Sequence, residues 1–120
     1  MKKLILSALF IILTIFFLVG CTESTKFKGA TENWEVEVMQ KGNLEQVQYR
    51  FKYLGVEQSI ESFSYRFESL NLNSSGTLSK TNSIPFIYET NIRFIGQKKI
   101  EVPLTATIGW NGKKEEIKLE

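Results

Sequence analysis

The chain has 120 residues, 42% of them hydrophobic, with 15 Lys and Arg, 13 Glu, a single Cys, and no His or Asp. One cysteine excludes an intramolecular disulfide, and the lack of His, Asp and a second Cys removes most metal ligands and the commonest catalytic bases. Because Lys2 and Lys3 lie at the amino terminus, residues 21–120 hold 13 positive and 13 negative side chains, which excludes a strongly basic nucleic-acid binder.

The first twenty residues have the pattern of a secretory signal. Lys2 and Lys3 precede an apolar stretch over residues 4–19, and the composition turns polar after Cys21. A basic start followed by such a stretch is typical of a signal peptide, and the stretch is slightly short for a spanning helix of about 20 residues. We therefore expect a cleaved signal helix over residues 1–20.

The end of this segment, Leu18-Val19-Gly20-Cys21, resembles the lipobox of bacterial lipoproteins. The resemblance implies that the Cys21 thiol receives a diacylglyceryl group and that cleavage follows between Gly20 and Cys21. A thiolate is a strong nucleophile, and two or more acyl chains give stable membrane attachment. The alternatives are an ordinary cleaved signal with an incidental Cys, and an uncleaved amino-terminal membrane helix.

A flexible tether is expected over residues 21–30, with Phe27 able to dock on the domain at residues 31–120. Alternation of apolar and polar residues predicts strands over residues 34–38 and 46–53. A two-residue loop at Lys41-Gly42 would pair Trp34 with Tyr49 and place both apolar sets on one face.

The middle of the chain is less regular. Alternation predicts a strand over residues 60–67, and an Asn- and Ser-rich stretch predicts a turn over residues 71–76. A short strand is expected at residues 77–79 and an extended segment at residues 85–90. Residues 91–96 are ambiguous between strand and loop.

The last part of the domain has the strongest strand signals. Residues 100–108 form the longest alternation, and Pro103 on its polar face predicts a sheet edge or a bulge. Asn111-Gly112 favours a type I′ hairpin turn, which pairs Trp110 with Lys113.

About seven short strands and no helical period predict an all-β antiparallel β-sandwich of immunoglobulin-like architecture. A small β-barrel is the alternative.

Several segments also resemble a known group of proteins. They are Glu32-Asn33-Trp34, Lys41-Gly42-Asn43-Leu44-Glu45 and residues 108–117, together with the lipobox. The chain is similar in these segments to small, largely uncharacterised lipoproteins of Bacillus-like Gram-positive bacteria. The resemblance implies a Gram-positive cell surface and brings no activity with it.

We considered the polar clusters as candidate sites. Two Ser-Lys arrangements and two carboxylate pairs are interpreted as solvated surface; they are Ser24 with Lys26, Ser79-Lys80, Glu35 with Glu37, and Glu115-Glu116. Neither a metal nor a cofactor is expected.

Trp110 flanks the tight turn, where an aromatic ring is often half-exposed. It is expected first to cover the open end of the sandwich, and it is the candidate ligand contact if its ring is exposed. Lys98-Lys99 and Lys113-Lys114 are interpreted first as solvated surface, and contact of one pair with anionic lipid is the alternative.

The expected function is a non-enzymatic binding or accessory module on the extracytoplasmic face of the cell membrane. Its partners would be membrane lipid through Cys21 and an envelope protein or wall ligand, with no nucleic acid. The alternatives are an immunity lipoprotein against an extracellular toxin or lytic enzyme, and an envelope-polymer hydrolase.

Overall fold

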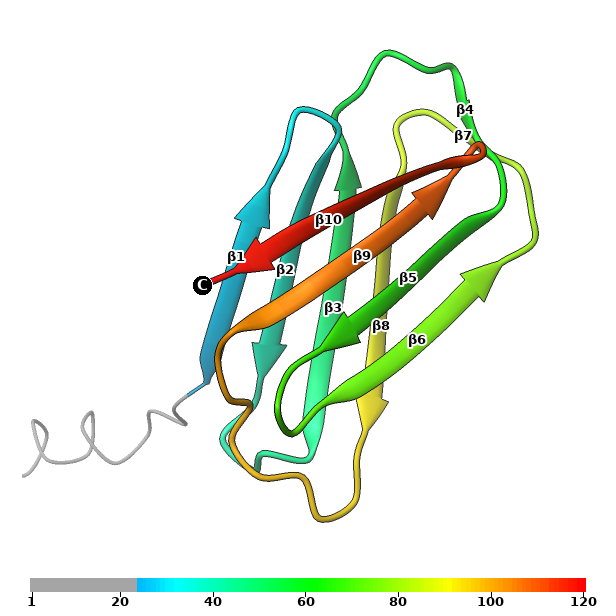
Figure 1. The fold of residues 1–120 in the computed structure, drawn as a ribbon. Helices are drawn as coiled ribbons and strands as arrows, with labels where there is room; N and C mark the ends of the chain where they lie inside the picture. The colour runs from blue at the N-terminus through cyan, green and yellow to red at the C-terminus, as the bar shows by residue number, and fades with distance from the viewer. Residues whose placement is uncertain (1–23) are drawn as a thin grey trace, which may run out of the picture.

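The computed structural model describes residues 24–120, which form two four-stranded antiparallel sheets packed face to face (Figure 1). One sheet has the order β1-β2-β3-β8 and the other β10-β9-β5-β6, while β4 and β7 form a two-stranded sheet. The strands are β1 (Thr25–Ala30), β2 (Trp34–Gln40), β3 (Gln46–Tyr53), β4 (Ser59–Ile60), β5 (Phe63–Glu68), β6 (Asn73–Leu78), β7 (Asn82–Ser83), β8 (Ile87–Arg93), β9 (Leu104–Trp110) and β10 (Lys113–Leu119). The expected signal helix lies outside the described residues.

The predicted β-sandwich of immunoglobulin-like architecture is confirmed, and the barrel alternative is wrong because the sheets do not close on themselves. At one edge the sheets meet: the Lys28 N–H donates to the Glu120 carbonyl at 2.9 Å, and the Glu120 N–H donates to the Lys28 carbonyl at 3.0 Å. Within residues 24–120 there is no helix that could cross a membrane.

Aromatic side chains fill the space between the sheets. They come from alternate positions of β2, β3 and β5, as the period of two requires. Trp34, Phe51 and Phe63 are fully buried, and the ring centroids of Trp34 and Phe63 lie 5.4 Å apart. Tilted and edge-to-face contacts of this kind stabilise beyond the area they bury, so the core holds the sheets together without a disulfide.

The prediction of a flexible tether over residues 21–30 is wrong for residues 25–30, which form β1. This strand pairs antiparallel with β2, with Thr25 opposite Gln40. Phe27 is buried, in agreement with the expectation that it docks on the domain. A Cβ at Gly29 would lie 2.6 Å from the Lys118 carbonyl, so β1 packs closely on β10. The strand was missed because an edge strand with a single inward apolar residue has the composition of a linker.

The predicted register of the first hairpin is also wrong. Gln40 pairs with Val47 and Trp34 with Tyr53, so the connection is longer than two residues. The Lys41 N–H bonds to the Gln46 carbonyl at 2.9 Å, and Leu44 adopts a φ of 65° inside the loop. The observed register differs from the predicted one by an even number of residues, so the apolar face of β3 still points toward the core.

The closing hairpin is confirmed. Trp110 pairs with Lys113, Ala106 with Ile117 and Leu104 with Leu119. Asn111 and Gly112 both have positive φ, 48° and 75°, as a type I′ turn requires.

Two boundaries differ from expectation. The predicted turn over residues 71–76 is largely strand β6, whose inner neighbour β5 supplies its hydrogen bonds. The last alternation is a strand only from Leu104, in the middle of its sheet, so Pro103 precedes the ladder instead of marking an edge or a bulge. Residues 91–93 belong to β8.

Candidate functional site

The strand directions gather the loops at two ends of the sandwich (Figure 1). We call the end at which β1 begins the entry end. It holds the loops of residues 41–45, 69–72 and 94–103. The opposite far end holds residues 31–33, 54–62 and 79–86 and the turn at residues 111–112. Cys21 is three positions before Ser24, so the chain joins the sandwich at the entry end.

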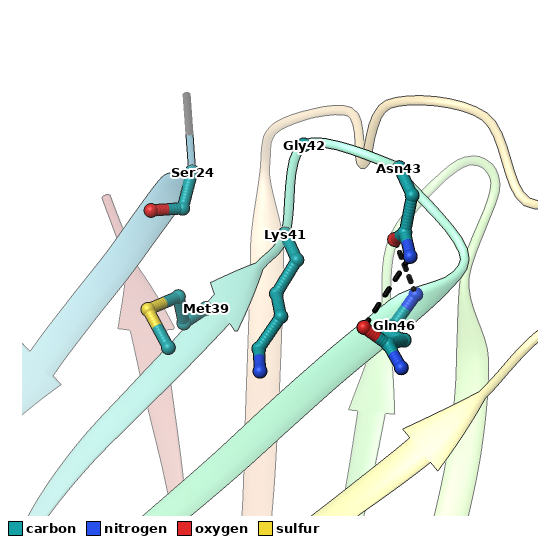
Figure 2. Close-up of a pocket in the computed structure, with 6 residues that line it drawn as sticks. All are labelled: Ser24, Met39, Lys41, Gly42, Asn43 and Gln46. Atoms are coloured by element: carbon teal, nitrogen blue, oxygen red, sulfur yellow. Dashed lines mark hydrogen bonds between the residues drawn. The ribbon is translucent and has the colours of Figure 1, made fainter. Parts of the chain in front are cut away.

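A shallow hollow of about 250 Å³ lies beside the first described residue (Figure 2). Its lining residues are Ser24, Met39, Lys41, Gly42, Asn43 and Gln46. The Asn43 amide donates to Gln46 Oε1 at 3.3 Å, and its oxygen accepts the Gln46 N–H at 3.1 Å. A second hollow of about 380 Å³ shares Lys41 and Gln46 with the first. An ammonium and neutral amides can contact an anion or a polar headgroup there.

Gln40 connects two loops of the entry end from inside. Its Nε2 donates to the carbonyls of Leu44 at 2.8 Å and Lys98 at 2.9 Å. Its Oε1 accepts the Ile100 N–H at 2.9 Å. Because the side chain is 1% exposed, these bonds form out of water and fix the loop of residues 94–103 against that of residues 41–45.

Asn71 connects the third loop to the same structure. Its Nδ2 donates to the Lys99 carbonyl at 2.6 Å, and its Oδ1 accepts the Glu101 N–H at 2.9 Å. The Gln97 side chain donates to the Asn71 carbonyl at 3.1 Å. The three loops therefore form one hydrogen-bonded surface.

Glu45 supports this end with its charge. Its carboxylate accepts the Gly96 N–H at 2.9 Å and pairs with Arg93 at 3.2 Å. The bond from the Gly96 N–H, and then the Arg93 guanidinium, lower the pKa of Glu45. The group is an anion that the fold already neutralises.

Exposed apolar and basic side chains lie together on these loops. Leu70 is 81% exposed and Ile95 is 90% exposed. Lys41, Lys98 and Lys99 are exposed as well, and none of them lies within ion-pair distance of a carboxylate of residues 24–120. The entry end thus combines apolar and cationic contacts.

The far end is organised around Glu57. Its carboxylate accepts bonds from Lys113 Nζ at 2.6 Å, Trp110 Nε1 at 3.2 Å and the Asn111 side-chain amide. The bonds from Lys113 and Asn111 lower the pKa of Glu57, and the bond to Glu57 raises the pKa of Lys113. Asn111 also donates to the Ser59 carbonyl at 2.9 Å. The cluster fastens the loop of residues 54–62 over the hairpin tip.

Trp110 covers the open end of the core, as expected first, and the alternative of an exposed ligand contact is wrong. Its side chain is 2% exposed, its ring centroid lies 5.6 Å from that of Trp34, and its N–H is bound by Glu57. Covered in this way, the ring closes the far end of the core and offers no face to a ligand. The sequence could not show that the loop of residues 54–62 folds back over it.

The other candidate groups lie apart or serve the fold. Glu35 and Glu37 point outward on β2, and Glu37 lies 3.9 Å from Lys26. Glu115 accepts the Thr31 hydroxyl at 2.9 Å and the Asn33 amide at 3.1 Å.

Glu116, Ser79 and Lys80 are exposed. In the described part of the chain no group of three or more metal-binding side chains comes together. Gly20 and Cys21 lie outside the described residues.

Comparison of the chain with protein-family models, curated proteins and solved structures finds no match.

Proposed function

We propose that this protein is a lipid-anchored binding or accessory module on the extracytoplasmic face of the cell membrane, held there by acylated Cys21. The observation that carries the proposal is the start of β1 at Thr25, four positions after Cys21. A lipobox directly followed by a folded strand fits a domain that is kept next to its anchor. The sequence resemblance to Gram-positive lipoproteins supports the same location.

Binding is the activity that the described polar groups favour. The carboxylates with hydrogen-bond partners, Glu45, Glu57 and Glu115, each fasten one loop or hairpin to another. Their role is accounted for by the fold. The far end, directed away from the anchor, is the surface through which an envelope protein or wall ligand would be engaged.

The test is fatty-acid labelling of the full chain in Gram-positive cells, with intact mass of the product. We expect the wild-type chain to begin at Cys21 and to carry label, and the C21S variant to remain unlabelled and uncut, because the hydroxyl cannot replace the thiol. Ser24→Ala, three residues later, is the matched control and should be labelled normally. An unlabelled wild-type chain, or equal labelling of C21S, would refute the anchor.

A further inference from the structure

We propose that the entry end of the sandwich docks on an anionic phospholipid bilayer, with Leu70 and Ile95 in the headgroup–acyl boundary and Lys41, Lys98 and Lys99 against the lipid phosphates. This inference rests on the proposed function, because acylated Cys21 brings this end to the membrane.

The length of the connection puts the entry end close to lipid. Only residues 22–24 separate Cys21 from Thr25, the first residue of β1. Four extended residue steps reach at most about 14 Å, and one headgroup layer is about 5–8 Å thick. Because Ser24 lines the hollow beside Lys41, the loop of residues 41–45 lies next to the point of attachment.

The apolar contacts are held ready for insertion. Leu70 and Ile95 are 81% and 90% exposed and lie on separate loops. Asn71, next to Leu70, and Gln97, two residues after Ile95, are joined by the bond from the Gln97 side chain to the Asn71 carbonyl. The two loops are thus fixed relative to one another, so burial of both apolar side chains in the interface requires no ordering of the backbone.

Charge distinguishes the two ends. In the entry-end loops three lysines carry positive charge and Glu101 opposes them with one negative charge. Glu45 is left out of this comparison because Arg93 and the Gly96 N–H already bind it. At the far end Glu32, Glu57 and Glu61 are balanced by Lys80, Lys113 and Lys114, and Lys113 is paired to Glu57. An anionic surface therefore attracts the entry end more strongly than the far end.

Both ends expose apolar side chains, so exposed apolar area alone does not determine which end docks on the membrane. Val56 at the far end is 98% exposed, and Leu54 on the same loop is 44% exposed. The attachment point and the three lysines favour the entry end. Val56 is likewise apolar and exposed but lies at the other end, so it provides an internal control.

The experiment uses the full mature lipoprotein in vesicles of phosphatidylglycerol or of phosphatidylcholine. An environment-sensitive dye is placed by I95C or, as the matched control, by V56C; acylated Cys21 does not react. In phosphatidylglycerol we expect the dye at position 95 to report an apolar environment and to be quenched from within the bilayer, while the dye at position 56 stays in water.

Charge-reversal variants test the contribution of the lysines to docking. Each lysine near an anionic surface contributes a factor of about five, so K98E/K99E should lower the docked-to-undocked ratio by at least about 30-fold. K80E/K114E, an equal change of charge away from the entry end, should leave the signal at position 95 unchanged. Added salt should weaken docking.

The outcomes separate the two proposals. Flotation of the protein with vesicles while the dye at position 95 stays in water overturns docking and leaves the anchor intact. Failure to float overturns both. A signal that rises with protein concentration in either lipid indicates a second copy of the chain on this surface and overturns lipid docking.

Discussion

Gln40 shows how a single residue organises one end of this molecule. Aromatic side chains aside, it is the one buried polar side chain of residues 24–120. It sits at the end of β2, where the alternation of the strand points it inward. There it satisfies the carbonyls of Leu44 and Lys98 and the N–H of Ile100, which the sandwich would otherwise leave without partners.

We predict that Gln40→Met, which keeps the volume and removes all three bonds, lowers the free energy of unfolding by about 3 kcal/mol, because buried backbone groups lose their partners. Gln48→Met on β3, half-buried and without a side-chain hydrogen bond among the described residues, should change it by less than about 0.5 kcal/mol. Urea unfolding midpoints at equal slope measure both. Equal effects of the two variants would show that Gln40 does not hold the loops.

At the scale of elements, β1 decides where the domain begins. It adds an edge strand to β2, buries Phe27, and meets the end of β10 through the two backbone bonds between Lys28 and Glu120. Gly29 leaves room for the Lys118 carbonyl. The strand therefore joins the two sheets at their shared edge, and a chain cut at residue 30 would lose this closure.

Phe27→Ala is expected to lower the free energy of unfolding by about 3 kcal/mol, as for other large-to-small changes of buried aromatic residues. Lys28→Ala, the next residue and exposed, should be neutral within about 0.5 kcal/mol. Chemical denaturation, with amide exchange of residues 25–30, measures the difference. If F27A were as stable as K28A, β1 would be a loosely held tether after all.

For the whole molecule, the charged groups that join loops set the pH range of stability. The pKa values of Glu45 and Glu57 are lowered from 4.5. Their contribution to stability is therefore present above about pH 4.5 and is lost as pH falls through the lowered folded values. At the alkaline end, burial raises the pKa of Tyr49 from 10.0 to about 12. The unfolded chain then ionises first, and stability falls as pH rises from 10 toward 12.

Since the chain has no His, we expect a flat stability profile from about pH 6 to 9 with losses on both sides. Glu57→Gln should flatten the acid side, and Tyr49→Phe the alkaline side, in thermal or urea unfolding across pH. Glu116→Gln, exposed on β10, is the control for the acid side. If the loss of stability at acid pH were the same in E57Q as in the wild type, a group other than Glu57 would be responsible for it.

The sequence by itself determined the features that depend on near neighbours. Alternation identified the strands with inward aromatic residues, such as those holding Trp34, Phe51 and Phe63, because burial on one face has a period of two. Asn111-Gly112 determined the closing hairpin and its register, since few residue pairs accept positive φ at both turn positions.

Only the tertiary structure decided the features that depend on distant partners. β1 is a strand because β2 and β10 cover it, Trp110 is buried because the loop of residues 54–62 folds over it, and Gln40 is satisfied by a backbone 58 residues away. Leu70, Ile95 and the three lysines became one surface only when the loops came together at the end where the chain enters. Such groupings arise from the packing of segments far apart in sequence, so no local pattern contains them.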